Sequence, residues 1–477
     1  MKKILFIGFL TVGILVSLTG QSDRDAFRFS QTDWQGTARF MGAGGAFGAV
    51  GGDFSSLSVN PAGIGLYKKS ETVFTPMMVS VFNNRSSYNG SSVYTNHTNY
   101  SLSNVGFVLS FPINNSLWKS IQFGYGYNRI SDFNNAFRIE GMSNNSSMMD
   151  EIVNKANGNI PGNLQGDEWL AYQTWMIDSV GFKQYDSPFE KQSLNQSRST
   201  ETSGGIDEMT FSFGGNYNDK FFIGATIGVP FLKYQERGIY KEAVSGEALS
   251  GITSYTIKDN LRVKGTGINL KLGIIYQAAK FLRIGAAFHT PTYYPTLRDS
   301  YYREMTSYYD NGKNSGLFDY SNEYKYSLTT PLKAIGSVAF LIQKRAFISA
   351  EYEFTSYAMS KMYAIDYSFI EENNNIQNKY GACHKVRVGA EVYITNSFLL
   401  RAGYHYKSSP YKDKINDASS HAISGGLGFR TKRFLFDLAY IYNTSKEDYW
   451  LYGSKYVNAA QIKYNTHRIV ATLGCKF

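Results

Sequence analysis

From residue 71 to the C-terminus, apolar and polar residues alternate along segments of about ten residues. In the last segment Ile469, Ala471 and Leu473 share one face, whereas Arg468 and Thr472 share the other. This period of two predicts β-strands. About fourteen segments have the pattern: 71–82, 100–111, 119–129, 207–217, 220–229, 264–277, 281–290, 324–342, 345–357, 379–394, 398–406, 421–430, 433–442 and 464–477.

The connections between these segments alternate between short and long. The short ones are 112–118, 218–219, 278–279, 343–344, 396–397 and 431–432. The long ones are 83–99, 130–206, 230–263, 291–323, 358–378, 407–420 and 443–463. Short periplasmic turns and long outer loops are typical of outer-membrane barrels. The pattern therefore predicts an all-β fold, a transmembrane antiparallel β-barrel of about 14 strands, with both termini on the periplasmic side.

The alternation also assigns the two faces of the wall. A charge on the lipid face near the bilayer midplane costs roughly 2–4 kcal/mol, so the apolar set is expected to face lipid. The charged residues, of both signs, then face inward, and Arg387 is expected to pair with Glu351 or Glu353 on a neighbouring strand. Two interpretations of this inner wall stay open: a network that braces the barrel, and a selective polar path.

Composition supports the barrel. The chain holds 37 Tyr and 33 Phe, yet its mean hydropathy is −0.29. This combination suits a wall with one apolar face and aromatic girdles. The formal net charge of +10 is attributed to turns and loops that face anionic lipid, and no basic cluster is dense enough to indicate nucleic-acid binding.

The first residues have the features of an export signal. Lys2 and Lys3 precede an apolar run from 4 to 18, which is too short to span a membrane comfortably as a helix. We predict a signal peptide at 1–20, cleaved after Gly20. The mature chain is then exported, with an N-terminal plug segment at 21–70 and a barrel that occupies 71–477.

A stretch at 36–66 fits neither a strand nor a membrane helix. Glycine and alanine fill its first half, so its backbone can approach other segments closely. It ends in Asn60-Pro61-Ala62-Gly63, where Pro61 fixes its own φ and biases Asn60 away from helix. We predict a compact plug. Its large apolar residues are Phe40, Met41, Phe47, Phe54 and Leu57.

The motifs of this stretch carry a resemblance. Met41-Gly42-Ala43-Gly44-Gly45-Ala46-Phe47, Gly52-Asp53 and Asn60-Pro61-Ala62-Gly63 resemble, in this order, the N-terminal hatch of the FadL/TodX family. These are Gram-negative outer-membrane channels for long-chain fatty acids and aromatic hydrocarbons. Segments 264–276 and 282–291 are similar to mid-barrel strands of that family. The resemblance implies a fourteen-stranded barrel with an N-terminal hatch, whereas the 130–206 connection is longer than it leads us to expect.

The resemblance also suggests how the hatch acts. Asn60, Pro61 and Ala62 resemble a motif of the gate region, so they form either a plug whose rearrangement opens a path or a rigid turn that seats it. The apolar residues Phe40, Met41, Phe47, Phe54 and Leu57 line a ligand pocket beside the hatch or form the core of the plug. Both alternatives stay open from the sequence.

The longest outer connection, 130–206, contains aromatic residues suited to capture of an apolar ligand. Residues 167–178 can form a helix on which Trp169, Tyr172 and Met176 share a face, with Trp175 nearby. Exposed aromatic area of this kind suits ligand capture. The alternative is packing of the loop onto the rim of the barrel.

No catalytic or metal site is predicted. His289 and His405 are expected to point into the barrel, and His384, His421 and His467 to point outward, so they form no cluster with metal-ligand spacing. Neither a nucleophile elbow nor a triad spacing occurs. We therefore expect a non-enzymatic protein without a cofactor.

Together these features predict a passive outer-membrane transporter for hydrophobic small molecules such as long-chain fatty acids. Its expected partners are the hydrophobic ligand, the lipids of the outer membrane and, by resemblance, the barrel assembly machinery that reads the terminal Phe477. A lateral exit through the wall is likewise implied only by the resemblance. The alternatives are a haem or other nutrient receptor and a structural or adhesive surface barrel.

Overall fold

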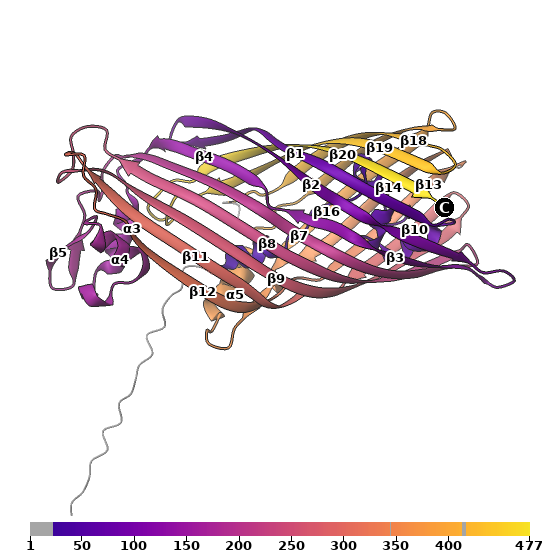
Figure 1. Ribbon diagram of the computed structural model, residues 1–477, viewed down its shortest axis with the longest axis horizontal. Coiled ribbons are helices and arrows are strands. Elements are labelled where there is room, and N and C mark those ends of the chain that lie inside the picture. The colour runs from indigo at the N-terminus through magenta and orange to yellow at the C-terminus, as the bar shows by residue number, and fades with distance from the viewer. Residues whose placement is uncertain (1–21, 344, 413–415) are drawn as a thin grey trace, which may run out of the picture.

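The computed structural model describes residues 22–343, 345–412 and 416–477. The predicted signal peptide at 1–20 lies outside the described residues. The chain forms a long barrel, with helices α3 and α4 at one end and the C-terminus at the other (Figure 1). In the described part of the chain no helix has the length and apolar character needed to cross a membrane.

The wall is built from strands that run antiparallel to their neighbours. They are β1 (Glu71–Tyr88), β2 (Ser91–Pro112), β3 (Trp118–Asp132), β4 (Asn135–Met142), β7 (Asn195–Tyr217), β8 (Phe221–Ala243), β9 (Ile252–Ala279), β10 (Leu282–His289), β11 (Tyr293–Tyr309), β12 (Phe318–Thr329), β13 (Lys333–Ile342), β14 (Ala346–Ser356), β15 (Lys361–Tyr363), β16 (Ala382–Tyr393), β17 (Phe398–Lys407), β18 (Ser420–Arg430), β19 (Phe434–Tyr449) and β20 (Ala460–Lys476).

The sheet closes on itself because β1 pairs with both β2 and β20. Within the described residues eighteen strands belong to this sheet, but four positions of the wall are shared by two strands separated by a break. The shared positions are β3 with β4, β10 with β11, β12 with β13 and β14 with β15. The result is a closed fourteen-stranded barrel, which confirms the predicted fold class.

Most of the predicted long loops are wrong in extent, because the strands continue outward through them. Residues 83–99 form the ends of β1 and β2 around a turn at Asn89-Gly90, and 230–263 is strand up to Ala243 and again from Ile252. Residues 291–323 contain β11. The alternation of apolar and polar residues fades in these outer halves, yet the backbone hydrogen-bond ladders continue there. Periodicity alone therefore placed the strand ends too early.

The predicted faces are confirmed. Leu400, Phe436 and Ile469 are each more than two-fifths exposed on the outside of the barrel, whereas Arg401 and Asp437 are buried inside it. The exposed apolar belt is the surface expected of a wall in contact with lipid. We therefore treat the barrel as spanning a membrane.

The segment before β1 lies inside the barrel, as predicted for the plug. It contains α1 (Asp23–Ser30), α2 (Ala38–Gly42) and the 3₁₀ turns η1 (Phe54–Leu57) and η2 (Pro61–Leu66). Helix α2 contacts strands β17 to β20, whereas η2 contacts β7, β8 and β9. Because these strands form different sides of the wall, the segment crosses the lumen.

Local sequence sets the turns of the hatch. The Thr37 hydroxyl accepts a hydrogen bond from the Phe40 amide at 3.1 Å and so caps α2. Asp53 caps η1 through the Ser55 amide at 3.0 Å. Asn60 caps η2 through the Ala62 amide at 3.1 Å, and Pro61 occupies the first position of that turn. Each cap satisfies a backbone amide that the short turns leave unpaired.

The 133–194 connection folds into a cap over the outer end (Figure 1). Besides β4 it contains α3 (Met148–Ala156), η3 (Pro161–Asn163), α4 (Gly166–Gln173), β5 (Asp178–Gly181) and β6 (Gln184–Asp186). Two further short elements, η4 (Tyr357–Met359) and α5 (Ile370–Lys379), follow β14. Cap residues share one hydrophobic cluster with the outer ends of β8 and β9.

Candidate functional site

The hatch touches the wall backbone directly where both carry glycine. A Cβ built on Gly44, whose φ is +67°, would lie 2.6 Å from the Val388 carbonyl oxygen, and one built on Gly389 would lie 2.0 Å from the Ala43 carbonyl oxygen. Gly403 faces Gly44 in the same way. Glycine is therefore required on both sides of this contact.

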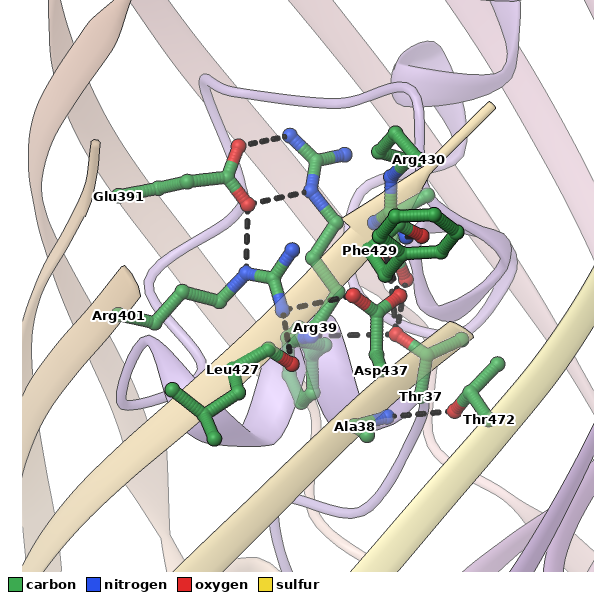
Figure 2. A network of polar contacts seen from close by, with 12 residues as sticks. Thr37, Ala38, Arg39, Glu391, Arg401, Leu427, Phe429, Arg430, Asp437 and Thr472 are labelled. Atoms are coloured by element: carbon green, nitrogen blue, oxygen red, sulfur yellow. Dashed lines mark hydrogen bonds and ion pairs between the residues drawn. The ribbon is translucent and has the colours of Figure 1, made fainter. Parts of the chain in front are cut away.

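An ion-pair network fixes α2 to the wall (Figure 2). The Arg39 guanidinium donates from Nε and Nη2 to the two Glu391 carboxylate oxygens on β16, at 2.9 and 2.8 Å. Arg401 on β17 donates to Glu391 at 2.6 Å and to Asp437 on β19 at 2.7 Å. Arg430 pairs with Asp437 at 2.8 Å. We call these five residues the latch network.

A second ion-pair cluster holds the next part of the hatch. Glu351 pairs with Arg387 and accepts a hydrogen bond from the Gly48 amide at 2.7 Å. Glu353 pairs with Arg387 at 2.6 Å and with Lys385 at 2.8 Å. The predicted pairing of Arg387 with these glutamates is confirmed. Because both networks contact hatch atoms, the inner charges brace the hatch as well as the wall.

The predicted hatch residues all lie in buried positions between hatch and wall. Phe40, Met41 and Phe47 pack in one hydrophobic cluster with wall residues of β13, β14 and β19. Phe54 and Leu57 pack with Val73 of β1 and Val108 of β2. These contacts are those of a plug core, and Phe40 is the member that also lines a cavity. The remaining predicted positions, Asn60, Pro61 and Ala62, are buried in η2 and its cap.

Two cavities lie on the α1 side of the plug core. The smaller, about 70 Å³, lies between Phe29, Trp34 and Phe40 of the hatch and wall residues that include Ile206 and Tyr294. The larger, about 340 Å³, lies beside α1. Its charged lining residues are Arg24, Arg28, Asp33, Asp132, Glu236, Lys385, Lys407, Lys446, Glu447 and Arg468. The interior thus offers a small recess, with aromatic side chains on one side and charged residues such as Glu208 and Lys271 on the other, next to a mixed-charge chamber.

Helix α1 was missed by the sequence analysis. Its signal was local: Ser22 and Asp25 form a capping box, and Ala26, Phe27 and Phe29 supply an apolar face. Burial raises the pKa of the Asp25 carboxyl, although Arg28 at 2.8 Å opposes that shift. The aromatic face of α1 makes one wall of each cavity.

Comparison with known proteins gave a consistent result at the level of fold. No family model and no curated protein sequence matches the chain. Among solved structures, a Pseudomonas aeruginosa FadL homologue is similar over 93% of this chain and 98% of its own, with a TM-score of 0.53 and 13% identity. The Ralstonia pickettii toluene transporter TbuX matches over 93% and 99%, with a TM-score of 0.51 and 13% identity. The Pseudomonas putida toluene transporter TodX matches over 92% and 98%, with a TM-score of 0.52 and 11% identity.

This chain has the FadL/TodX fold. The resemblance drawn from the hatch motifs is therefore confirmed for the architecture.

In the wall of this FadL/TodX-type barrel, neighbouring strands lose their pairing beside the hatch. The β2–β3 ladder stops at Asn104 and Asn128, although β3 continues beside β7 as far as Asp132. The Ser103 hydroxyl there donates to the Gly36 carbonyl of the hatch at 2.7 Å. Within the described residues, the buried side-chain amides of Asn104 and Gln35 have no hydrogen-bond partner. The unpaired wall thus adjoins the hatch.

The histidines face as predicted. His289 is buried with its Nε2 2.8 Å from the Val59 carbonyl oxygen, and His405 is buried edge-on to Trp34 at 4.9 Å between ring centroids. His384, His421 and His467 lie on the outside. In the described part of the chain no three metal-ligating side chains come together in a group that could hold an ion.

The proposed capture residues of this FadL/TodX-type barrel lie in the cap. Trp169 and Tyr172 are partly buried against the cap core and Met176 is fully buried, whereas Trp175 is 62% exposed. The predicted helix over 167–178 is too long, because α4 ends at Gln173 and Trp175 has a φ of +59°. Capture by this group remains a prediction, and Trp175 is its most accessible member.

Proposed function

We propose that this barrel is a passive outer-membrane transporter for hydrophobic small molecules such as long-chain fatty acids. The observation that carries the proposal is a hatch that crosses the lumen, is tied to the wall by the Arg39–Glu391 ion pair and the hydrogen bond from Gly48 to Glu351, and has a recess beside it with Phe29 and Phe40 on its aromatic side. The similar solved structures, a FadL homologue and two toluene transporters, support the same class of cargo.

The route that we propose runs from the cap to the wall. A ligand is captured near Trp175, enters the larger cavity beside α1 with one end in the recess at Phe40, and stays there until the turn at Asn60-Pro61-Ala62 rearranges. It leaves sideways where the β2–β3 ladder ends, beside Ser103 and Gly36. Sideways exit avoids a passage through the periplasmic part of the hatch, which is closed by packed backbone.

No chemical step is part of this proposal, and transport follows the gradient of the ligand. Passive entry requires binding that is favourable enough to occupy the recess and weak enough to release. A recess with one apolar side and a charged chamber next to it meets this requirement for an amphiphile. The aromatic side chains of Phe29, Trp34 and Phe40 form the apolar side of the recess.

A haem or other nutrient receptor is the second candidate, and one observation favours it. Among the described residues His405 is buried beside the larger cavity with neither ring nitrogen hydrogen-bonded. A haem ligand role predicts a Soret shift on adding haem that disappears in His405→Gln and His289→Gln. A structural or adhesive barrel predicts no bound ligand and no uptake at all.

The test combines identification with transport. Protein purified in mild detergent is extracted and its small amphiphiles are identified by mass spectrometry, and uptake of a fluorescent long-chain fatty acid is measured in proteoliposomes. We expect a co-purified apolar ligand, saturable uptake, and reduced uptake in Phe40→Asp, with Trp118→Asp on the outer wall near the periplasmic turns as a control for folding. Absence of both ligand and uptake in the folded wild type refutes the proposal.

A further inference from the structure

Four cations lie side by side on the outside of the barrel. They are direct cross-strand partners on four adjacent strands: Lys233 on β8 faces Lys264 on β9, Lys264 faces Arg298 on β11, and Arg298 faces Lys325 on β12. All four side chains are exposed. We call these residues the cation row.

The cation row lies at the outer boundary of the apolar belt. On β8 the outward residues run from Phe221 through Ile227 to Phe231, and Lys233 follows. On β9 they include Ile268 and Lys264 and continue beyond the apolar belt to Arg262. Twelve residues separate Phe221 from Lys233, which at about 3.3 Å per residue and a tilt of about 40° is roughly 30 Å along the barrel axis. This matches the thickness of a bilayer core, so the row lies at head-group depth.

The described part of the chain supplies no ion-pair partner to the row. Within residues 22–343, 345–412 and 416–477 none of the four cations forms an ion pair with a carboxylate, although Lys258 pairs with Glu304 at 2.7 Å farther out on β9 and β11. Glu323 lies two residues beyond Lys325 without such a contact. Like charges directly opposite one another destabilise a sheet. Three such juxtapositions in one line therefore call for an external anion.

A groove of about 960 Å³ adjoins one end of the row. Arg298 and Lys325 line it together with the carboxylates Asp299, Glu323 and Asp366 and with the apolar or aromatic residues Tyr293, Pro295, Tyr363 and Ile365. Ile365 is 95% exposed and Tyr363 is 62% exposed on this outer surface. Cations at the head-group level and exposed apolar side chains beside them match the two ends of a lipid.

A shorter arrangement lies on another side of the barrel, where Arg85 on β1 faces Lys463 on β20 and both side chains are exposed. His467 lies four residues inward of Lys463 and accepts a hydrogen bond from, or donates one to, the Tyr440 hydroxyl at 2.7 Å.

We propose that the cation row binds the phosphate groups of a lipid in the leaflet at the outer end of the barrel, with acyl chains against Phe231, Ile268 and the groove. Phosphate oxygens accept charge-assisted hydrogen bonds from guanidinium and ammonium groups. They also relieve the repulsion between the cations. The inference depends on the proposed outer-membrane location and not on the identity of the transported ligand.

The experiment is native mass spectrometry of the full-length barrel in mild detergent, with bisphosphorylated lipid A or its dephosphorylated counterpart as the added lipid. Wild type is expected to retain phosphorylated lipid and to lose the dephosphorylated form. The quadruple variant K233Q/K264Q/R298Q/K325Q should lose at least one bound lipid, with retention roughly fivefold weaker for each cation removed. The double variant K264Q/R298Q, at the centre of the row, provides the same reading if the quadruple variant folds poorly.

The control removes the same charge elsewhere. K220Q/K280Q/K432Q/R433Q neutralises four exposed cations on the short turns at the opposite end and should keep the lipid. Equal retention of both lipid forms by wild type, or unchanged retention in the double variant, overturns the proposal. If the substitutions abolish a protein dimer and not a lipid adduct, the proposal is also overturned, because the cation row would then be a contact between two copies of the protein. None of these readings depends on fatty-acid transport.

Discussion

Releasing the latch network should open the hatch, and Arg39→Gln is the substitution that does so. Arg39 makes two hydrogen bonds to Glu391, which is 4% exposed, and a third to the Gly52 carbonyl at 3.0 Å. Removing one partner of a buried ion pair costs about 3–5 kcal/mol. Since Arg401 still pairs with Glu391, the lower end applies, about 3 kcal/mol. The ratio of released to seated hatch should then rise roughly 100-fold.

The assay is conductance in planar bilayers, where a released hatch leaves the lumen open to ions. We expect brief open events in Arg39→Gln that are about 100-fold more frequent than in wild type. Arg430→Gln is the matched control, because it removes the same charge from the same network. Arg430 pairs with Asp437, and in the Arg430→Gln variant Asp437 still has its ion pair with Arg401. Among the described residues Arg430 forms no ion pair with the hatch.

Two results refute this reasoning. If Arg39→Gln conducts no more than wild type while inserting normally, the ion pair does not hold the hatch. If Arg430→Gln opens as often as Arg39→Gln, the effect comes from weakening the wall and not from releasing α2. Insertion is checked by heat-modifiable migration, so a misfolded variant is recognised before its conductance is compared.

Other predictions concern the hatch turn, the topology and assembly. Gly45→Val should lower fatty-acid uptake at normal surface level, because Gly45 has a φ of +76° and a Cβ there would lie 3.0 Å from the Trp34 ring; Gly158→Val, at an open position of similar φ, is the control. Pro61→Ala should change uptake by freeing φ at the start of η2, and unchanged uptake would separate this turn from gating. A tag at Gly312 should be labelled on intact cells and one at Asn396-Ser397 should not; the reverse would invert the orientation. Deleting Phe477, whose amide donates to the Ser70 carbonyl at 3.0 Å, should lower the yield of folded barrel in outer-membrane fractions.

The membrane-facing half of the fold could be predicted from the sequence because lipid imposes a strict alternation there. Leu400 and Arg401 are neighbours in the sequence, but Leu400 is exposed on the outside of the barrel and Arg401 is buried inside it. The apolar or charged character of each residue predicts which side it faces. The same argument anticipated a contact of Arg387 with Glu351 or Glu353, and the structure has both. The hatch could be recognised from its run of small residues, which permits close backbone contact, and from Asn60-Pro61, where proline fixes φ.

The outer half was harder because water lies on both of its sides. Residues such as Asn96 and Thr98 in β2 satisfy either face, so the strand continues without a period in hydropathy. Breaks at Pro291 and Pro331 each divide one position of the wall between two strands. As a result β10 pairs with β13 and β11 pairs with β12, and the sequence pattern did not separate these strands. The cation row was invisible for a related reason: its members are 27 to 92 residues apart in the chain, and register alone brings them together.

The contacts of α2 have a consequence for the time course of biogenesis. Arg39 meets Glu391 at a separation of 352 residues, and the Ala38 amide meets Thr472 at 434. Contacts so distant along the chain form late, because the loop they close is almost the whole protein. The hatch residues, which lie near the N-terminus of the chain, are therefore among the last to form their native contacts. The hatch cannot complete its contacts before β16 and β20 are in place, so the permeability barrier depends on how quickly the hatch seats after the last strand closes the barrel.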